Sequence, residues 1–364
     1  MVGRRSRETP DKRIRHDTFG NVPALSILSR TISTTTTNTR HKMDVSIVIV
    51  SWNARDYLVK CLRSIEETRG NLTLEVIVVD NASSDGSPEA VAGQFPWVQL
   101  IQTGANLGFA RGNNVGIVRS TGRYVCLINS DVVLLKGCLQ GLVEFMDAHP
   151  AVGLAGPRIL NADRTFQISM RRSPSLWANW GQAFFLDRTP LLSVLFPRVE
   201  IQPTRDDVVR EVPVLYGMFW MASRRALEQV GGLDEDYFMY GEDVDWCRRF
   251  HAAKWKVMYY PPSEAIHFGG ASSAVAPVKY FIENRKSRLL YFQKNHGRWA
   301  RAMDAGALLV ESALRTAAWS MACWLGRGDA RRNALMRDRN VACLKWLVAG
   351  SSAGDAKDYR EPRK

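Results

Sequence analysis

Residues 74–80 read LEVIVVD, a run of β-branched and other apolar residues that stops at an aspartate. A second run, YVCLINSD at 124–131, also ends in an aspartate. Short apolar runs of this kind are typical of strands buried on both faces of a parallel sheet. Ligands of open α/β sheets bind outside the carboxyl ends of such strands. Asp80 and Asp131 are therefore expected at one rim, where carboxylates suit a hard divalent cation and a phosphorylated substrate.

The chain on either side of these runs alternates apolar and amphipathic stretches. Strands are predicted at 45–50, 74–79, 97–101 and 124–128, and helices at 54–67, after Pro88, at 108–119 and at 137–149. Such alternation predicts an α/β fold, a Rossmann-like and mostly parallel sheet with helices on both faces. Beyond residue 150 the pattern is looser. There we expect strands at 212–223 and 256–260, and helices at 224–230, 242–252 and 280–296.

The positive charge of the chain is weighted toward its N-terminus. Residues 1–42 carry nine Lys/Arg against three Asp/Glu, and so supply +6 of the formal net charge of +13. This segment is rich in Ser/Thr and lacks apolar periodicity, which is typical of disorder. It has no apolar h-region of a secretory signal. We interpret it as a disordered extension before a start at Met43, with a transit peptide as the alternative. Once the basic segment 1–42 is set aside, the remaining charge gives little reason to expect nucleic-acid binding.

The cysteines indicate a reducing compartment. None of the six forms a CxxC pair, and several lie in apolar runs; they are Cys61, Cys126, Cys138, Cys247, Cys323 and Cys343. Buried free thiols explain this pattern better than disulfides or a zinc site.

Six motifs occur in a fixed order and together resemble one protein family. They are VSIVIVSWNARDYLVKCLRSI (45–65), VVDNASSDGS (78–87), NLGFARGNNVGI (106–117), LINSD (127–131), GGLDEDYFMYGEDVDWCRR (231–249) and HFGG (267–270). Over roughly Val45 to His296 the chain resembles family-2 inverting glycosyltransferases of the GT-A fold. It is most similar to their rhamnosyltransferase-like branch, which builds bacterial surface polysaccharides. The resemblance implies a GT-A catalytic domain over 43–297 and transfer of rhamnose from dTDP-rhamnose to a glycan or lipid-linked acceptor.

The resemblance also implies a donor site around the first aspartate. Asp80 stands where the family contacts the uracil or thymine base of the donor, and Asn81 and Ser83 lie beside it. Asp85 is a further donor residue or, alternatively, an Asx-turn or helix cap before Gly-Ser-Pro.

A glycine-rich loop beginning at Asn106 follows and is placed by the resemblance near the nucleotide. Glycines recur there every four residues, which is not the GxGxxG of a dinucleotide site. Arg111 can form charge-assisted bonds to a phosphate. The alternative is a simple turn into a helix.

A metal site is implied by Asn129-Ser130-Asp131, which stands where the family carries its DxD-like motif. The first position here is Asn, so one carboxylate remains. Mg²⁺ needs only one or two carboxylates when substrate phosphates complete its shell. We expect Asp131 and His267 to hold Mg²⁺ or Mn²⁺, with Asn129 and Ser130 facing the donor.

The catalytic residues are expected in the Glu242-Asp243 pair at the start of a helix. Acidic residues in a first turn also simply complement the helix dipole. Adjacent helical residues point about 100° apart, so one can face a cleft while the other caps the helix or pairs with an arginine. Asp243 aligns with the family base, which takes the proton of the acceptor hydroxyl. Glu242 is assigned to the same catalytic site.

Gly217 and Trp220 lie in the expected strand that borders the acceptor in the family. Trp220 can stack on a sugar face, or it can pack in the core.

The C-terminal region is predicted to form amphipathic helices over 298–350, followed by a disordered tail at 351–364. Val310, Leu314, Ala317, Met321 and Trp324 recur at helical spacing. Basic residues near Trp346 add positive charge, which suits an anionic membrane surface. The helices either pack on the catalytic domain or hold a cytoplasmic enzyme at the inner face of the plasma membrane.

Three alternatives stay open. Within the enzyme class, the donor is UDP-galactofuranose or a UDP-N-acetylhexosamine. In a different class, the chain is a non-catalytic GT-A protein that binds nucleotide-sugars or glycans. A Rossmann oxidoreductase would need GxGxxG after the first strand, where SWNARDY stands instead.

Overall fold

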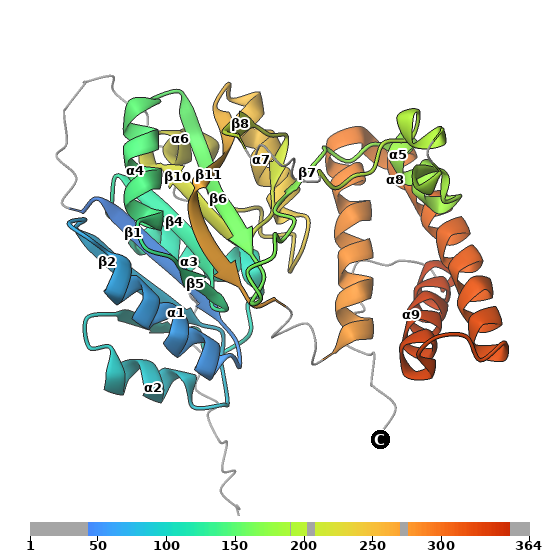
Figure 1. Ribbon diagram of the computed structural model, residues 1–364, viewed down its shortest axis with the longest axis horizontal. Coiled ribbons are helices and arrows are strands. Elements are labelled where there is room, and N and C mark those ends of the chain that lie inside the picture. The colour runs from blue at the N-terminus through green and yellow to red at the C-terminus, as the bar shows by residue number, and fades with distance from the viewer. Residues whose placement is uncertain (1–42, 190, 202–207, 270–275, 350–364) are drawn as a thin grey trace, which may run out of the picture. The chain divides into compact units, whose positions relative to one another are not determined.

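The fold is built on a nine-stranded sheet, one half of which is parallel (Figure 1). The computed structural model describes residues 43–349 apart from 190, 202–207 and 270–275. Strand β1 (Val45–Ser51) lies between β2 (Leu74–Asp80) and β4 (Tyr124–Asn129). Strand β3 (Gln99–Gln102) adds to the free side of β2, and all these pairings are parallel. The carboxyl ends of β2 and β4 therefore meet at one edge, as the sequence predicts.

The other half of the sheet is mixed. Strand β10 (Phe219–Ser223) runs antiparallel between β4 and β6 (Val152–Leu160). Strand β11 (Lys256–His267) runs parallel to β6 and antiparallel to β5 (Val132–Leu134). The remaining strands are β8 (Arg210–Glu211), which pairs with β11, and β7 (Met170–Arg171) with β9 (Val214–Leu215), which form a separate small sheet.

Alternation of side chains along the strands creates two cores, one on each face of the sheet. Ile47 and Ile49 point into one core and Val48 into the other. The first core is covered by α1 (Arg55–Thr68), α2 (Ser87–Gln94) and α4 (Cys138–Ala148). The second is covered by α3 (Phe109–Arg119), α6 (Arg224–Val230) and α7 (Glu242–Ala252). The predicted α/β class with helices on both faces is confirmed.

The sequence reading of residues 212–223 as one strand is wrong. The chain forms β9, turns through Tyr216–Met218, and then forms β10 in a different sheet. The predicted strand at 256–260 is instead the start of the longer β11, which continues past Pro261 and Pro262 through a register shift and ends at His267. Both departures bring polar residues to the same end of the sheet.

The C-terminal region is helical and packs on an excursion of the chain after β7. Helix α8 (Pro277–Trp324) contains a non-helical residue at Gly297, where φ is 82°. Helix α9 (Ala330–Val348) and α5 (Leu176–Ala183) both contact α8. Two short 3₁₀ turns follow α5, namely η1 (Leu186–Arg188) and η2 (Leu192–Val194). The helix expected at 280–296 is thus the first half of α8.

The predicted boundary of the C-terminal region at residue 298 coincides with the Gly297 kink. A division of the chain into a catalytic domain and C-terminal helices stays a prediction. The predictions for residues 1–42 and 351–364 lie outside the described residues.

All six cysteines are free, and five of them are buried. In the part of the chain that the structure describes, no helix combines the length and the apolar character that crossing a bilayer requires.

Candidate active site

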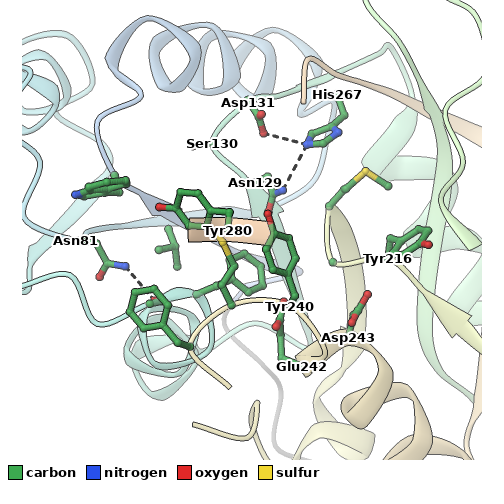
Figure 2. A pocket seen from close by; sticks show the side chains of 18 of the residues that line it. Asn81, Asn129, Ser130, Asp131, Tyr216, Tyr240, Glu242, Asp243, His267 and Tyr280 are labelled. Atoms are coloured by element: carbon green, nitrogen blue, oxygen red, sulfur yellow. Dashed lines mark hydrogen bonds and ion pairs between the residues drawn. The ribbon is translucent and has the colours of Figure 1, made fainter. Parts of the chain in front are cut away.

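A cavity of about 410 Å³ opens at the carboxyl ends of the parallel strands (Figure 2). Its floor comes from residues that directly follow β1, β2 and β4, among them Trp52, Asn81 and Ser130. The glycine-rich loop, Gln167 and Ile168, the turn between β9 and β10, residues 238–240, 242 and 243 at the start of α7, His267 at the end of β11, and Tyr280 at the start of α8 complete the lining. One cavity therefore collects residues from nine separate parts of the sequence.

Most of the predicted site residues line this cavity. They are Asn81, Asn106, Asn129, Ser130, Asp131, Gly217, Glu242, Asp243 and His267. Five predicted residues do not: Asp80, Ser83, Asp85, Arg111 and Trp220. Figure 2 separates the lining into two groups, with Asp131, His267 and Asn129 on one side and Glu242 and Asp243 on the other.

Asp131 and His267 form the centre of the first group. Asp131 follows β4 and His267 ends β11, and Nε2 of the imidazole lies 3.2 Å from Oδ1 of the carboxylate. Asn129 approaches the same nitrogen, with Nδ2 3.5 Å away. The amide oxygen Oδ1 of Asn129 is buried and has no hydrogen-bond partner among the residues that the structure describes.

Gln167 determines which ring nitrogen of His267 carries the proton. Its Nε2 donates to Asn161 Oδ1 at 2.8 Å, which leaves its Oε1 2.6 Å from Nδ1 of His267. Nδ1 must therefore carry a proton, and Nε2 faces Asp131. Metal-bound histidines usually have their second nitrogen fixed in this way. Sequence reasoning missed Gln167, because no pattern marks it in the irregular stretch between β6 and β7.

These residues fit a hard divalent cation. An imidazole nitrogen and a carboxylate oxygen that face each other need a proton or a cation between them. Among the described residues no group of three or more His, Cys, Asp or Glu side chains is placed to hold a metal. Mg²⁺ and Mn²⁺ accept so few protein ligands when phosphate oxygens and water supply the others.

The second group consists of two carboxylates that are both buried. Glu242 and Asp243 are the first residues of α7, which begins after Gly241 in the left-handed conformation, with φ of 82°. Burial raises the pKa of Glu242 well above its usual range, and the charge of Asp243 raises it further. Within the described part of the chain, Glu242 Oε2 has no hydrogen-bond partner. An unpaired carboxylate in such surroundings favours its protonated form.

The pKa of Asp243 is set by opposing effects. Burial raises the pKa of Asp243, while the charge of Arg171 on β7 lowers it, as does the hydrogen bond that Val244 N–H donates to its Oδ1 at 2.8 Å. Arg171 also lies over the ring of Tyr216, with its guanidinium carbon 5.9 Å from the ring centre. The pKa of Asp243 is therefore higher than that of an exposed aspartate, and the positive charge of Arg171 limits the increase. Sequence reasoning missed Arg171 as well.

Asp80, Ser83 and Asp85 shape the loop after β2 and do not line the cavity. Asp80 Oδ2 accepts a hydrogen bond from Ser83 N–H at 3.0 Å, and its buried Oδ1 has no partner. Asp85 accepts from Arg55 N–H at 2.8 Å and from Ser87 N–H at 3.1 Å. Partial burial raises the pKa of Asp85, but these hydrogen bonds outweigh it and lower the pKa overall. The turn-forming alternative for Asp85 therefore matches what the structure contains.

Asn81 and Asn106 hold the glycine-rich loop at the cavity. Asn81 Nδ2 donates to the carbonyl of Gly108 at 3.0 Å, and Asn106 Oδ1 accepts from Gly108 N–H at 3.0 Å. A Cβ at Gly108 would lie 2.4 Å from the carbonyl oxygen of Phe238, so only glycine fits at this crossing. Arg111 points elsewhere and pairs with Glu235 at 3.4 Å, with both side chains half exposed.

The expectation that Trp220 contacts the acceptor needs correction. Trp220 is fully buried, packs against Trp246 with ring centres 5.1 Å apart, and donates its indole N–H to the carbonyl of Leu215 at 3.2 Å. It belongs to the core because it points away from the cavity along a strand buried on both faces. Gly217, in the turn before β10, does line the cavity.

Aromatic residues that the sequence did not single out stand between the two groups. Tyr240 has φ of 66°, a conformation that non-glycine residues seldom adopt. Figure 2 shows its ring together with that of Tyr280 between the Asp131 side and the Glu242 side. Rings in this position can stack on a sugar or a base.

Comparisons with known proteins agree with this geometry. Residues 46–231 match the model of the family described as "Glycosyl transferase family 2". The chain is 30% identical over 284 residues to the N-acetylglucosaminyl-diphospho-decaprenol L-rhamnosyltransferase of Mycobacterium tuberculosis, covering 74% of this chain and 91% of that protein. It is 24% identical over 258 residues to rhamnosyltransferase WbbL of Escherichia coli K12, covering 69% and 93%.

A solved structure shares the fold. The mannosyltransferase of Pyrobaculum calidifontis, in complex with GDP-Man and Mn²⁺, superimposes with a TM-score of 0.50 at 18% identity. The match covers 85% of this chain and 88% of that one.

Proposed function

This chain belongs to glycosyltransferase family 2, and we propose that it transfers rhamnose from dTDP-rhamnose, with inversion, to a polyprenyl-diphosphate-linked acceptor. The observation that carries the proposal is a single cavity with Asp131 and His267 on one side and Asp243 on the other. The two rhamnosyltransferase relatives support rhamnose as the sugar, and the decaprenol acceptor of the mycobacterial relative supports a lipid-linked acceptor.

In the proposed reaction Asp243 is the general base. The acceptor hydroxyl oxygen attacks the anomeric carbon from the face opposite the diphosphate, and the bond from that carbon to the diphosphate oxygen breaks. The proton of the hydroxyl passes to Asp243. Burial supports this role because it raises the pKa of Asp243, and a base works best when its pKa approaches the working pH. Glu242, buried beside it, is proposed to stay protonated and orient the acceptor.

Asp131 and His267 are proposed to hold Mg²⁺ or Mn²⁺. Such a cation neutralises the charge of a departing diphosphate. The Mn²⁺ in the solved mannosyltransferase supports this assignment. Gln167 keeps Nε2 of His267 available by holding the proton on Nδ1.

Asn81, Asn106 and Ser130 are proposed to contact the donor from the cavity floor. Asp80, Ser83 and Asp85 act indirectly, because their hydrogen bonds set the loop from which Asn81 reaches the cavity. Gly217 leaves room for the acceptor. The lipid part of such an acceptor lies in a bilayer, so we place the enzyme at the inner face of the plasma membrane.

A panel of nucleotide-sugars tests the donor. Melting temperature is measured with dTDP-rhamnose, UDP-galactofuranose and UDP-N-acetylglucosamine, each with and without Mn²⁺ or Mg²⁺. Binding to the folded state raises stability, so the true donor should give the largest metal-dependent rise. Turnover of that donor with a polyprenyl-diphosphate-linked N-acetylglucosamine acceptor then separates an enzyme from a binding protein. A larger rise with either UDP-sugar overturns the assignment of the donor.

A further inference from the structure

Large apolar side chains exposed to solvent are concentrated in one part of the molecule. Of the 19 such side chains among the described residues, 14 belong to residues 177–195 and 299–348. The rest of the described chain, which is the larger part of it, exposes only the other five. Contiguous apolar surface of this kind marks an interaction site.

The first part of this surface is residues 173–198 apart from 190, which we call the α5 excursion. It leaves the sheet after Arg172 and returns at Val199, where Arg172 N–H donates to the Val199 carbonyl at 2.7 Å. Internally it is well packed, since the ring of Trp177 stacks on Phe196 at 4.5 Å. Yet Leu191 is 82% exposed and Val194 81% exposed. None of the residues that the structure describes covers these side chains.

The second part is a stripe along the distal half of α8. Trp299, Met303, Leu314, Met321 and Trp324 are all exposed, and Trp324 is 83% exposed. At 100° per residue these five positions fall within about 80° of one another around the helix axis. The stripe is thus one continuous face, which α9 leaves uncovered.

The excursion and the stripe meet. Gly306 lies on the same face of α8, between Met303 and Leu314, and its Cβ position is 3.6 Å from the indole of Trp180 in α5. Figure 1 shows the excursion, in green, beside the second half of α8. The apolar side chains therefore belong to one surface, which we call the α5–α8 surface.

Charge decides which partner fits this surface. Residues 298–349 contain nine Lys/Arg and four Asp/Glu. Two of the four acids, Asp304 and Glu311, are buried in ion pairs with arginines, at 2.6 Å from Arg288 and 3.0 Å from Arg315. The outward charge is therefore positive, with Arg327, Arg331 and Arg332 exposed next to the end of the stripe. A second copy of the chain would bring the same charge and be repelled, whereas an anionic lipid surface attracts it.

We propose that the α5–α8 surface docks the protein on an anionic lipid bilayer. Leu191, Val194, Met321 and Trp324 enter the boundary between headgroups and acyl chains, and the arginines contact lipid phosphates. Tryptophans are common at such a boundary because the indole is apolar with one polar edge. The surface lies outside the cavity, so docking does not depend on which sugar or acceptor the protein uses.

Co-sedimentation of the full chain with lipid vesicles, in the absence of substrates, tests the proposal. Vesicles of phosphatidylcholine alone are compared with vesicles that also contain phosphatidylglycerol. We expect binding to the anionic vesicles at low salt and weaker binding at high salt. The double variant Leu191→Ser/Val194→Ser and the double variant Met321→Ser/Trp324→Ser should each reduce the partition coefficient by about tenfold or more. Arg331→Gln/Arg332→Gln should reduce it by about fivefold per charge.

The matched control is Trp97→Ser/Val118→Ser, which removes two exposed apolar side chains elsewhere; Val118 is 73% exposed. Because residues 1–42 add nine Lys/Arg of their own, the informative quantity is the difference between test and control variants of the full chain. Unchanged melting temperature shows that each variant folds.

Three results overturn the proposal: no sedimentation with anionic vesicles at low salt, equal loss in the control, or a dimer in analytical ultracentrifugation that the same substitutions dissociate. The donor panel is run without vesicles, so failure of docking and failure of the proposed transferase activity are read separately.

Discussion

Gln167 Oε1 lies 2.6 Å from Nδ1 of His267, so a residue outside every recognised motif decides which imidazole nitrogen faces Asp131. We expect Gln167→Ala to weaken Mn²⁺ binding by about 10- to 100-fold, as loss of such a supporting hydrogen bond usually does. Isothermal titration calorimetry measures this directly. Gln102→Ala, at an exposed position on β3, is the control. Equal affinity in both variants would show that Gln167 does not support a metal site.

Replacing Asp243 tests the proposed base. Asp243→Asn keeps the shape of the side chain and removes its basicity. We expect turnover to fall by about 10²-fold or more, while the affinity for the nucleotide-sugar stays within a few-fold of wild type. Steady-state kinetics and donor titration give the two values. Turnover close to that of the wild type would remove Asp243 from the mechanism.

Arg171 should set the acid limb of the activity profile. Asp243 accepts a proton only when ionised, so activity falls as pH drops through its pKa, which burial has raised. The cation of Arg171 lowers that pKa, so Arg171→Gln should move the acid limb of kcat/KM to higher pH. The measured pKa belongs to the coupled Glu242–Asp243 pair. A shift to lower pH would contradict the arrangement.

We expect Glu242 to lower the free energy of unfolding at neutral pH. Because its pKa is raised on folding, the folded state holds the proton more tightly than the unfolded chain does. Stability associated with this group is complete below its unfolded pKa and is lost as pH rises through the folded one. Glu242→Gln should therefore raise the melting temperature at pH 7 by about 2–4 °C, and the gain should vanish toward pH 4. A gain that grows on acidification would reverse the sign of the argument.

Gly108 should tolerate no side chain. Its φ is 83°, and a Cβ there would lie 2.4 Å from the Phe238 carbonyl oxygen. Gly104→Ala is the matched control, since Gly104 has φ of 72° and nothing within 4 Å. The control should lose about 1–2 kcal/mol of unfolding free energy from backbone strain alone. Gly108→Ala should lose clearly more, and donor affinity with it, because Phe238 lines the cavity. Chemical denaturation of the two variants gives the comparison.

The parts of the site carried by regular strands could be predicted from sequence. Asp131 and Asn81 follow apolar runs whose register fixes where they emerge, so their place at one edge follows from the sheet. Asp80 shows the limit of this reasoning. It ends β2 but does not line the cavity, whereas the next residue, Asn81, does. Trp220 shows the same limit of prediction, because the sequence pattern alone does not reveal that both faces of β10 are covered.

The residues that escaped prediction come from segments without periodicity. Gln167 and Arg171 lie between β6 and the α5 excursion, where only tertiary contacts decide the direction of a side chain. Gly297 was easier to interpret, because a glycine with positive φ normally ends a helix, and the break between the helix predicted at 280–296 and the C-terminal helical region lies there.

The junction of the α5 excursion has a consequence for the cavity. The excursion is tied to the small sheet by the Arg172–Val199 hydrogen bond and an adjoining bridge between Arg171 and Glu200. Arg171 belongs to this tie and also lowers the pKa of Asp243 through its charge, so one side chain at the root of the excursion connects it to the cavity.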